Sequence, residues 1–300
     1  MKQIYFFSLF ILFFCVKQGL WAQNQLLPDF YYTPYENEIS ALSNKQSNNE
    51  WLLFLNNWKA FEGNSLNEIG QSFFKKEYDD SNWKIQKLPD STAKPKSKIL
   101  FYRKFVPIPE IFYGREIFLN IDDTTDLFSI WINGKQAYKK TSNSHILTNI
   151  TSVVKFGGMN LINIVYKNDK NPTLGLCRAV RLYSLSPVYV KNFSFSNSIV
   201  NNNEITISGI VQIVNTHIKE KTKVNLGISI YTLSGKNIYQ NNRIANYSIK
   251  QSILKDCEIN FSIMNDTILQ KKENLKILLT INDLVGNKLV LSSELKLFQK

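Results

Sequence analysis

The chain has 300 residues, of which 44% are hydrophobic and 13% aromatic, enough for about two domains with apolar cores. Its formal net charge of +12 comes from 36 Lys and Arg residues against 24 Asp and Glu residues. The basic residues are scattered and form no block of like charge, which argues against a nucleic-acid-binding arm. A mildly basic, solvated surface accounts for this charge. Affinity for acidic glycans or for an anionic membrane surface is the alternative.

Residues 1–22 have the pattern of a secretory signal peptide. Lys2 supplies the positive start, residues 5–16 form an apolar run too short to span a membrane, and Ala22 ends an acceptable cleavage site. We therefore expect a secreted or periplasmic protein with no membrane span after cleavage. Cys15 raises a lipoprotein as an alternative, although the large residues before it do not fit a lipobox. An uncleaved anchor is a further alternative.

The next part of the chain combines a polar segment with one helical signal. Residues 23–49 are polar and are interpreted as a lead-in arm, so that the first domain is expected over residues 50–187. Within it, apolar residues at helical spacing predict one short helix over residues 65–76. Residues 91–98 contain a proline and three lysines and predict an exposed loop.

Two stretches in the middle of the chain alternate strictly between apolar and other residues. The alternation over residues 117–121 and again over residues 128–132 has a period of two, which predicts strands with one buried face. Asn133-Gly134 then supplies the positive φ angles of a tight type I′ turn, and residues 135–138 form the return strand. A β-hairpin at the centre of an all-β sandwich is therefore predicted.

Ser186-Pro187 marks the end of the first domain. Residues 188–300 hold several short alternating strands at regular spacing, a pattern that favours an immunoglobulin-like sandwich. The strands are expected over residues 188–195, 204–214, 223–233, 237–246, 256–264, 275–282 and 288–297.

Short motifs follow one another in a fixed order between residues 55 and 180. They are LNNWKAF (55–61), YDDSNW (78–83) with Leu-Pro after it (88–89), YRKF (102–105), WINGK (131–135), NIT (149–151), NLINIVY (160–166) and GLCRAV (175–180). In this order they resemble the N-terminal jelly-roll domain of family 2 glycoside hydrolases. That family includes β-galactosidases, β-glucuronidases and β-mannosidases.

The resemblance implies an all-β chain of two domains. A galactose-binding-like jelly-roll sandwich over residues 50–187 would precede the immunoglobulin-like sandwich over residues 188–300, as in enzymes of the family. Catalysis in that family belongs to a third domain, a barrel of about 250 residues that carries two glutamates about 5 Å apart. The sequence stops at Lys300, where the resemblance would place the start of that barrel. We therefore expect no hydrolase site in these two domains.

The same resemblance points to three candidate carbohydrate ligands. Asp169 follows the strand over residues 160–166, at the position where β-galactosidases of the family extend an aspartate toward the substrate. Asn168 and His145 are nearby loop residues in the same fold. An ordinary turn residue is the alternative for each of the three.

Two departures from the family argue against a family-like rim around such a site. Residues 143–146 stand where the family has a Gly-aromatic-x-Pro-Phe loop, and residues 90–92 replace its usual His-Asp-Trp. Trp58, Trp83 and Trp131 match core positions of the family. We expect them to be buried rather than to form a sugar-stacking platform.

Catalytic, cofactor and metal signatures are missing from the sequence. Only two histidines occur, His145 and His217, and the sequence contains no glycine-rich phosphate loop and no metal-ligand spacing. Asp79-Asp80 is predicted to serve turn and cap roles. The cluster Asp122, Asp123 and Asp126 leaves a structural calcium site as an alternative. We expect no cofactor.

After signal cleavage the chain has two cysteines, Cys177 and Cys257, in different predicted domains. An oxidising compartment permits a bridge, but two free or buried thiols are the preferred interpretation.

The sequence thus favours a secreted, non-catalytic, carbohydrate-associated binding or scaffold protein whose partners are a glycan or a protein within a complex. One alternative is the front fragment of a split or truncated β-glycosidase. The other is a structural or adhesin-like module that contacts only proteins, because a fold by itself does not fix a function.

Overall fold

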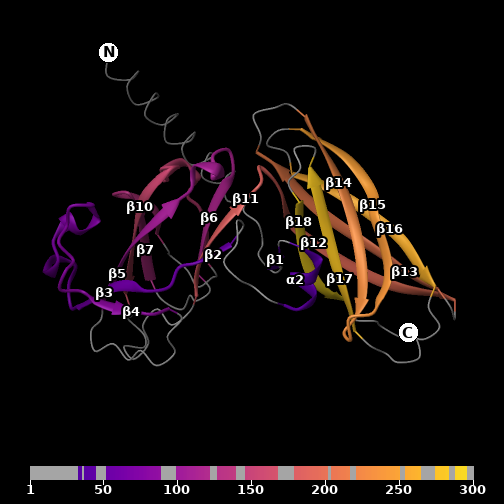
Figure 1. Ribbon diagram of the computed structural model, residues 1–300, viewed down its shortest axis with the longest axis horizontal. Helices are drawn as coiled ribbons and strands as arrows, with labels where there is room; N and C mark the ends of the chain where they lie inside the picture. Colours follow the sequence, from indigo (N-terminus) through magenta and orange to yellow (C-terminus); the bar gives the residue numbers. More distant parts are fainter. Residues whose placement is uncertain are drawn as a thin grey trace, which may run out of the picture. The chain divides into compact units, whose positions relative to one another are not determined.

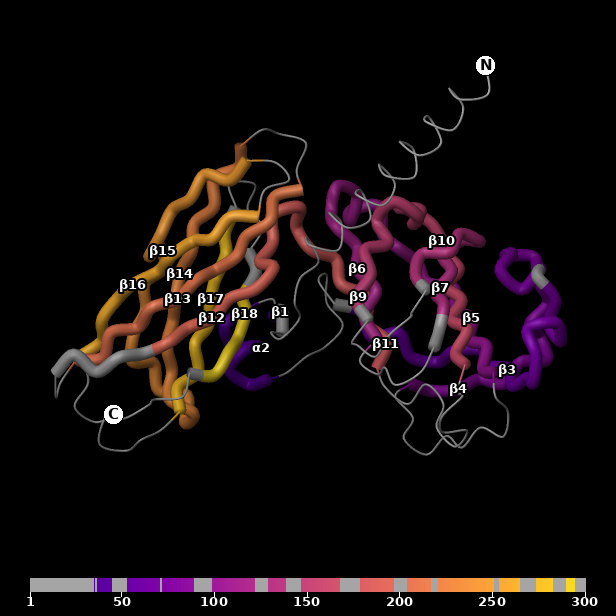
Figure 2. Tube along the Cα trace, turned by 180° about the vertical axis from the view of Figure 1, so that it is seen from behind, coloured from indigo at the N-terminus to yellow at the C-terminus, as the bar shows by residue number. Residues whose placement is uncertain are grey.

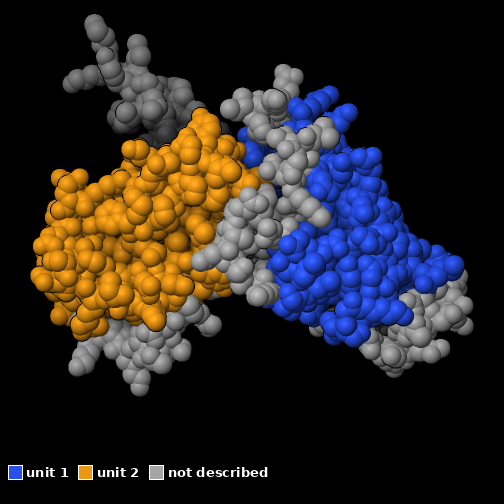
Figure 3. All heavy atoms as spheres, viewed as in Figure 1, with its two compact units in different colours: residues 1–45, 187–300 blue, residues 46–186 orange. Residues whose placement is uncertain are grey.

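The structure is a computed structural model that describes residues 33–35, 37–44, 52–88, 99–121, 127–139, 146–167, 179–201, 204–216, 221–250, 254–264, 274–283 and 288–295. The chain divides into two compact units, shown in blue and orange in Figure 3. Unit 1 comprises residues 1–45 and 187–300, and unit 2 comprises residues 46–186. Apart from one short α-helix and four 3-10 helices, all described elements are strands, which confirms the predicted all-β class.

Unit 2 is a sandwich of a six-stranded and a four-stranded sheet, both antiparallel (Figure 1). The larger sheet has the order β4 (Lys84–Gln86), β3 (Trp58–Gly63), β5 (Ile99–Ile108), β10 (Gly158–Lys167), β7 (Leu127–Ile132) and β8 (Lys135–Lys139). The smaller sheet has the order β2 (Leu52–Phe54), β11 (Val180–Leu185), β6 (Glu116–Ile121) and β9 (Ile146–Asn149). Short 3-10 helices lie between the strands, namely η1 (Leu66–Glu68) and η2 (Gln71–Phe74) between β3 and β4, η3 (Glu110–Phe112) between β5 and β6, and η4 (Thr151–Val153) between β9 and β10.

Alternation along the strands builds the core of unit 2. Ile162 and Ile164 of β10 and Leu119 of β6 all belong to one buried cluster between the sheets. Trp58 is fully buried in the same cluster, and its Nε1 donates a hydrogen bond to the carbonyl oxygen of Leu55 at 2.6 Å. The indole therefore fills the core without leaving its one polar atom unpaired.

The predicted hairpin is confirmed as β7 and β8. Ile132 pairs with Lys135, and the two turn residues have positive φ angles, 50° at Asn133 and 82° at Gly134. The Nδ2 atom of Asn133 also donates to the Oδ1 atom of Asn160 at 2.8 Å, which ties the turn to β10. An asparagine is thus required here both for the backbone angle and for its side-chain amide.

The prediction of one short helix over residues 65–76 was wrong. The structure has two separate 3-10 helices there, η1 and η2, because Gly70 between them has a φ of 67°, outside the helical region. Phe73 from η2 and Ile69 pack with Phe101 of β5 in a second buried cluster, on the side of the large sheet opposite the main core.

Unit 1 is a second antiparallel sandwich (Figures 1 and 2). Its five-stranded sheet has the order β1 (Thr33–Tyr35), β18 (Lys288–Leu295), β17 (Leu275–Asp283), β14 (Lys221–Thr232) and β15 (Asn237–Lys250). Its three-stranded sheet has the order β12 (Val188–Asn201), β13 (Glu204–Asn215) and β16 (Leu254–Met264). Every strand expected after Ser186-Pro187 is present, with ends that differ by a few residues.

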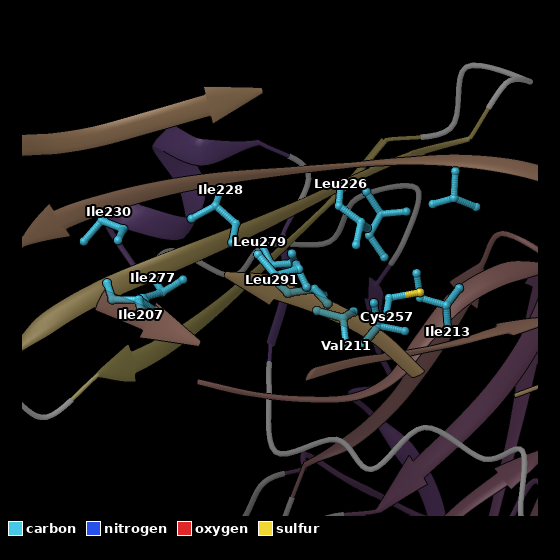
Figure 4. Close-up of a cluster of buried hydrophobic side chains, with 14 of the residues drawn as sticks. Ile207, Val211, Ile213, Leu226, Ile228, Ile230, Cys257, Ile277, Leu279 and Leu291 are labelled. Carbon is cyan, nitrogen blue, oxygen red and sulfur yellow. The ribbon is translucent and has the colours of Figure 1, made fainter. Parts of the chain in front are cut away.

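The core of unit 1 lies between these two sheets (Figure 4). Leu226, Ile228 and Ile230 of β14 alternate inward, and so do Ile277 and Leu279 of β17. Cys257 lies among them as a free, buried thiol, and burial raises its pKa to about 11. The thiol therefore stays protonated at neutral pH and acts as a small apolar side chain. Cys177 lies outside the described residues.

Part of the segment interpreted as a lead-in arm belongs to the fold of unit 1. β1 pairs with β18, and α2 (Glu38–Leu42) lies beside β1 and β18 in both Figures 1 and 2. Tyr35 and Ala41 are buried against the sheet in a small cluster with Leu278. Lys276 reinforces this attachment, because its ammonium group donates to the Oδ1 atom of Asn44 at 2.7 Å. The many polar residues around them concealed these apolar anchors in the sequence.

Within the described part of the chain, no helix has both the length and the apolar composition needed to cross a bilayer.

Candidate functional site

The three predicted carbohydrate ligands, Asp169, Asn168 and His145, lie outside the described residues. The strand ends next to them are described. Asn168 directly follows Lys167, the last residue of β10, and His145 directly precedes Ile146, the first residue of β9. The structure thus gives the strand ends that flank the candidate residues, Lys167 and Ile146, which together form the frame of the candidate site. It does not test the positions of the candidate residues themselves.

The strand ends of this frame belong to one end of the unit 2 sandwich. In the large sheet, Lys167 pairs with Ile99 of β5 and with Leu127 of β7. In the small sheet, Ile121 of β6 pairs with Ile146 of β9. Ile121 and Leu127 are joined only by residues 122–126, which span at most about 20 Å when fully extended. The two candidate segments therefore start from the same end of the sandwich.

The possible calcium ligands Asp122, Asp123 and Asp126 also fall outside the described residues. Among the residues that are described, no group of three or more His, Cys, Asp or Glu side chains is placed to hold a metal ion.

The three described tryptophans of unit 2 pack into the fold to different degrees. Trp58 and Trp83 are buried, as predicted. The prediction that Trp131 is buried was wrong, because its side chain lies on the face of β7 opposite the main core, where it is only partly covered. Its indole stacks on Phe74 with ring centroids 3.9 Å apart. Its Nε1 donates a long hydrogen bond of 3.4 Å to the hydroxyl of Ser129.

A buried ion pair occupies the centre of this covered face. The guanidinium of Arg103, on β5, is 1% exposed, and its Nε donates to the Oδ2 atom of Asp80 at 2.9 Å. The other carboxylate oxygen accepts from the ammonium group of Lys59 at 2.7 Å. Arg103 also donates to the carbonyl oxygen of Phe73 and, at 3.2 Å, to the Oδ1 atom of Asn163.

The turn role predicted for Asp79 and Asp80 is confirmed, since the backbone carbonyl oxygen of Asp80 accepts from the N–H of Trp83 at 3.1 Å, but the carboxylate of Asp80 has a second role. The Oδ1 atom of Asp79 accepts from the backbone N–H of Ser81 at 2.9 Å, whereas Asp80 joins two cations. The partner that sequence reasoning missed is Arg103, a charged residue inside an otherwise apolar strand. Such a residue signals a buried counter-charge elsewhere in the chain.

The environment of Asp80 determines what this carboxylate can do. Burial raises the pKa of Asp80, but the hydrogen bonds and charges of Lys59 and Arg103 lower it by more, so that the net shift is downward. A carboxylate with both oxygens engaged and a lowered pKa remains ionised, and it is a poor general acid. We assign the cluster of Asp80, Arg103 and Lys59 to the stability of the fold.

Comparison with known proteins gives similarity in structure alone. No protein-family model matches the chain, and no curated protein matches it in sequence. The structure of a β-glucuronidase from glycoside hydrolase family 2 matches with a TM-score of 0.68 and 18% identity, covering 84% of this chain and 31% of that one.

Two further solved structures give the same result. Bacteroides uniformis β-glucuronidase 2 has a TM-score of 0.64 and 16% identity, with 82% of this chain and 32% of that chain covered. A putative β-galactosidase from Bacteroides fragilis has a TM-score of 0.65 and 16% identity, with 82% and 41% covered. The chain thus spans about a third of the length of these enzymes. The predicted resemblance to family 2 glycoside hydrolases is confirmed at the level of the fold.

Proposed function

We propose that this chain is a secreted, non-catalytic, carbohydrate-associated binding or scaffold protein. The observation that supports this function most directly is the pairing of two β-sandwiches whose fold matches a part of family 2 β-glucuronidases and β-galactosidases. Asp79 and Asp80, the two carboxylates within the matched motifs, are engaged in a turn and in ion pairs. A binding role fits these two sandwiches better than hydrolysis does.

The binding residues that we propose are Asp169, Asn168 and His145, at the end of the unit 2 sandwich where β10 stops and β9 starts. A carboxylate there can accept hydrogen bonds from two sugar hydroxyls, each worth roughly 1.5–3 kcal/mol before competition with water. Because water competes at an open site, we expect affinity on the order of millimolar, or about −4 kcal/mol.

The variant Asp169→Asn tests this assignment. It should weaken glycan binding several-fold and change the free energy of unfolding by no more than about 0.5 kcal/mol, as for an ordinary surface substitution. Isothermal titration and thermal melting of the full chain measure the two effects. Unchanged affinity would exclude Asp169 as a ligand. A collapse of stability would instead identify a structural turn residue or an ion ligand.

The first alternative, the front fragment of a β-glycosidase, draws support from the enzymes whose structures match. It predicts that aryl β-glycosides are cleaved when the catalytic portion is present. For the chain of 300 residues we expect no release of the aryl group above buffer. Turnover that survives repurification, and that co-elutes with the chain, would reveal a catalytic site and reject the non-catalytic function.

The second alternative, a protein-interaction module, is favoured by an exposed apolar surface on unit 2. Ile111 and Tyr113, at η3, are 78% and 76% exposed, and Tyr113 contacts Phe156 edge-on with ring centroids 5.7 Å apart. Exposed apolar side chains that lie together can mark a protein contact. If the chain binds no glycan on an array and hydrolyses no aryl β-glycoside, this alternative is favoured.

Export is the remaining part of the proposal, and it rests on the signal-peptide pattern of residues 1–22. N-terminal sequencing of the protein recovered from its native compartment should begin close to Gln23. An intact Met1 in a cytosolic fraction would contradict export.

A further inference from the structure

Unit 1 carries a polar cavity of about 360 Å³ on the outer face of its five-stranded sheet. Residues from three elements line it, namely Asn37, Glu38 and Ile39 at the start of α2, Gln240 and Asn242 of β15, and Thr280 and Asn282 of β17. Its volume falls at the lower end of the range for small-molecule sites. The cavity lies within one unit and is separate from the strand ends that flank Asp169.

A local irregularity of the sheet forms this cavity. β14 runs between β15 and β17, and opposite Thr280 it carries Gly227, which has no side chain to fill the space. On the other side, the pairing jumps from Leu226–Ala245 to Ile228–Asn241, so that β15 bulges beside Gly227. A Cβ atom at Gly227 would lie 3.0 Å from the carbonyl oxygen of Asn242. Glycine therefore permits the close approach of the bulge.

The wall next to α2 is held in place by hydrogen bonds. The carboxylate of Glu38 accepts from the hydroxyl of Ser229 at 3.2 Å and from that of Tyr231 at 3.0 Å. Burial raises the pKa of Tyr231, and the hydrogen bond to Glu38 raises it further, so that the phenol keeps its donor proton. Glu38 thus has two fixed donors behind it and lines the cavity from a defined position.

The chemistry of the lining is that of side-chain amides. Asn37, Gln240, Asn242 and Asn282 each carry an acceptor oxygen and a two-proton donor. Pairs of such groups match the alternating donors and acceptors of vicinal hydroxyls. The Nε2 atom of Gln240 donates to the Oδ1 atom of Asn242 at 3.2 Å, so that these two amides are already neighbours.

We infer that this cavity of unit 1 binds a neutral saccharide unit through the amides of Gln240, Asn242 and Asn282. Among the described residues, the lining contains no lysine or arginine to pair with an anion, and it includes the carboxylate of Glu38. A carboxylated sugar would meet like charge without compensation, so the site discriminates against uronic acids. The exposed side chain of Ile39 offers apolar surface to the C–H face of a sugar ring.

The test is a titration of the isotope-labelled full chain with galactose, glucose, N-acetylglucosamine and glucuronate. The NMR chemical shifts of the amide groups are measured at each sugar concentration. We expect at least one neutral sugar to shift signals of residues 240–242 and 280–282 saturably, with a Kd on the order of 1–10 mM. Glucuronate should bind at least about five-fold more weakly, in line with like-charge repulsion.

Two variants and one matched control test whether the sugar binds in this cavity. Gln240→Ala and Asn242→Ala should each weaken the neutral sugar about five-fold or more, the loss of one or two hydrogen bonds to the ligand. Asn260→Ala, an exposed amide on β16 in the other sheet, should leave the Kd unchanged. Because Gln240 is exposed, we expect Gln240→Ala to fold even if Asn242→Ala, which lies in the bulge of β15, does not.

Three outcomes would overturn the inference. They are the absence of any saturable shift with neutral sugars up to about 50 mM, equal affinity for glucuronate, and a Kd that neither variant changes. Binding lost in Asp169→Asn but retained in Gln240→Ala would reject this cavity and support the proposed site on unit 2. Binding lost only in the unit 1 variants would do the reverse.

Discussion

Replacing Trp58 with alanine should lower the free energy of unfolding of unit 2 by about 3–5 kcal/mol, the usual result of truncating a buried indole. Trp58 is fully buried, and its Nε1 is paired with the carbonyl oxygen of Leu55. The substitution removes both the packing and the donor, and it leaves a cavity in the main core. Denaturant unfolding monitored by the circular dichroism of the full chain measures the loss.

Trp131→Ala is the matched control for this prediction. It removes the same side chain from a partly buried position, where the indole contacts Phe74 but does not reach the main core. The expected loss is about half as large, in proportion to the apolar area removed. Equal losses for the two variants would contradict the assignment of Trp58 to the centre of the fold.

Replacing Asp80 with alanine should destabilise unit 2 by about 3–5 kcal/mol, because it leaves the buried guanidinium of Arg103 without its counter-charge. Asp79→Ala is the control. It removes a carboxylate from the neighbouring exposed position, where its hydrogen bonds come from Ser81 in the same turn, and it should have a clearly smaller effect. A larger effect of Asp79→Ala would contradict the ion-pair assignment.

The same carboxylate makes stability depend on pH. The pKa of Asp80 is lowered in the folded protein from the ordinary value of 3.8, so the folded state binds this proton less tightly than the unfolded state does. The stabilisation is therefore fully present above the unfolded pKa and is lost as the pH falls through the folded pKa. Below about pH 4, Asp80→Asn should show a flatter loss of stability than the unmodified protein.

Most of the fold could be predicted from the alternation of apolar and other residues along the strands and from one turn. Residues 128–132 and Asn133-Gly134 specify the hairpin locally, because a period of two and a positive φ angle each have one structural solution. The strands of unit 1 could be located for the same reason. Sequence pattern cannot show which strands pair across the chain, as β1 does with β18, because that pairing depends on contacts far apart in sequence.

The candidate sites were less predictable than the fold. The ion pair of Asp80 and Arg103 joins two segments that neither alternation nor spacing connects. The cavity of unit 1 depends on a bulge opposite Gly227 and on a five-residue helix anchored by Tyr35 and Ala41, none of which gives a periodic signal. Asp169, Asn168 and His145 come from resemblance to a family, and they stay predictions.

Glycan binding by the intact chain is the most direct test of the account. The full chain, displayed multivalently so that avidity offsets weak single-site affinity, should be applied to a glycan array beside a display of the variant carrying both Asp169→Asn and Gln240→Ala. We predict saturable binding to a subset of neutral glycans by the unmodified chain and its loss in the double variant. No signal from the unmodified chain would contradict a carbohydrate-binding function, and equal signals from both displays would contradict both assigned sites.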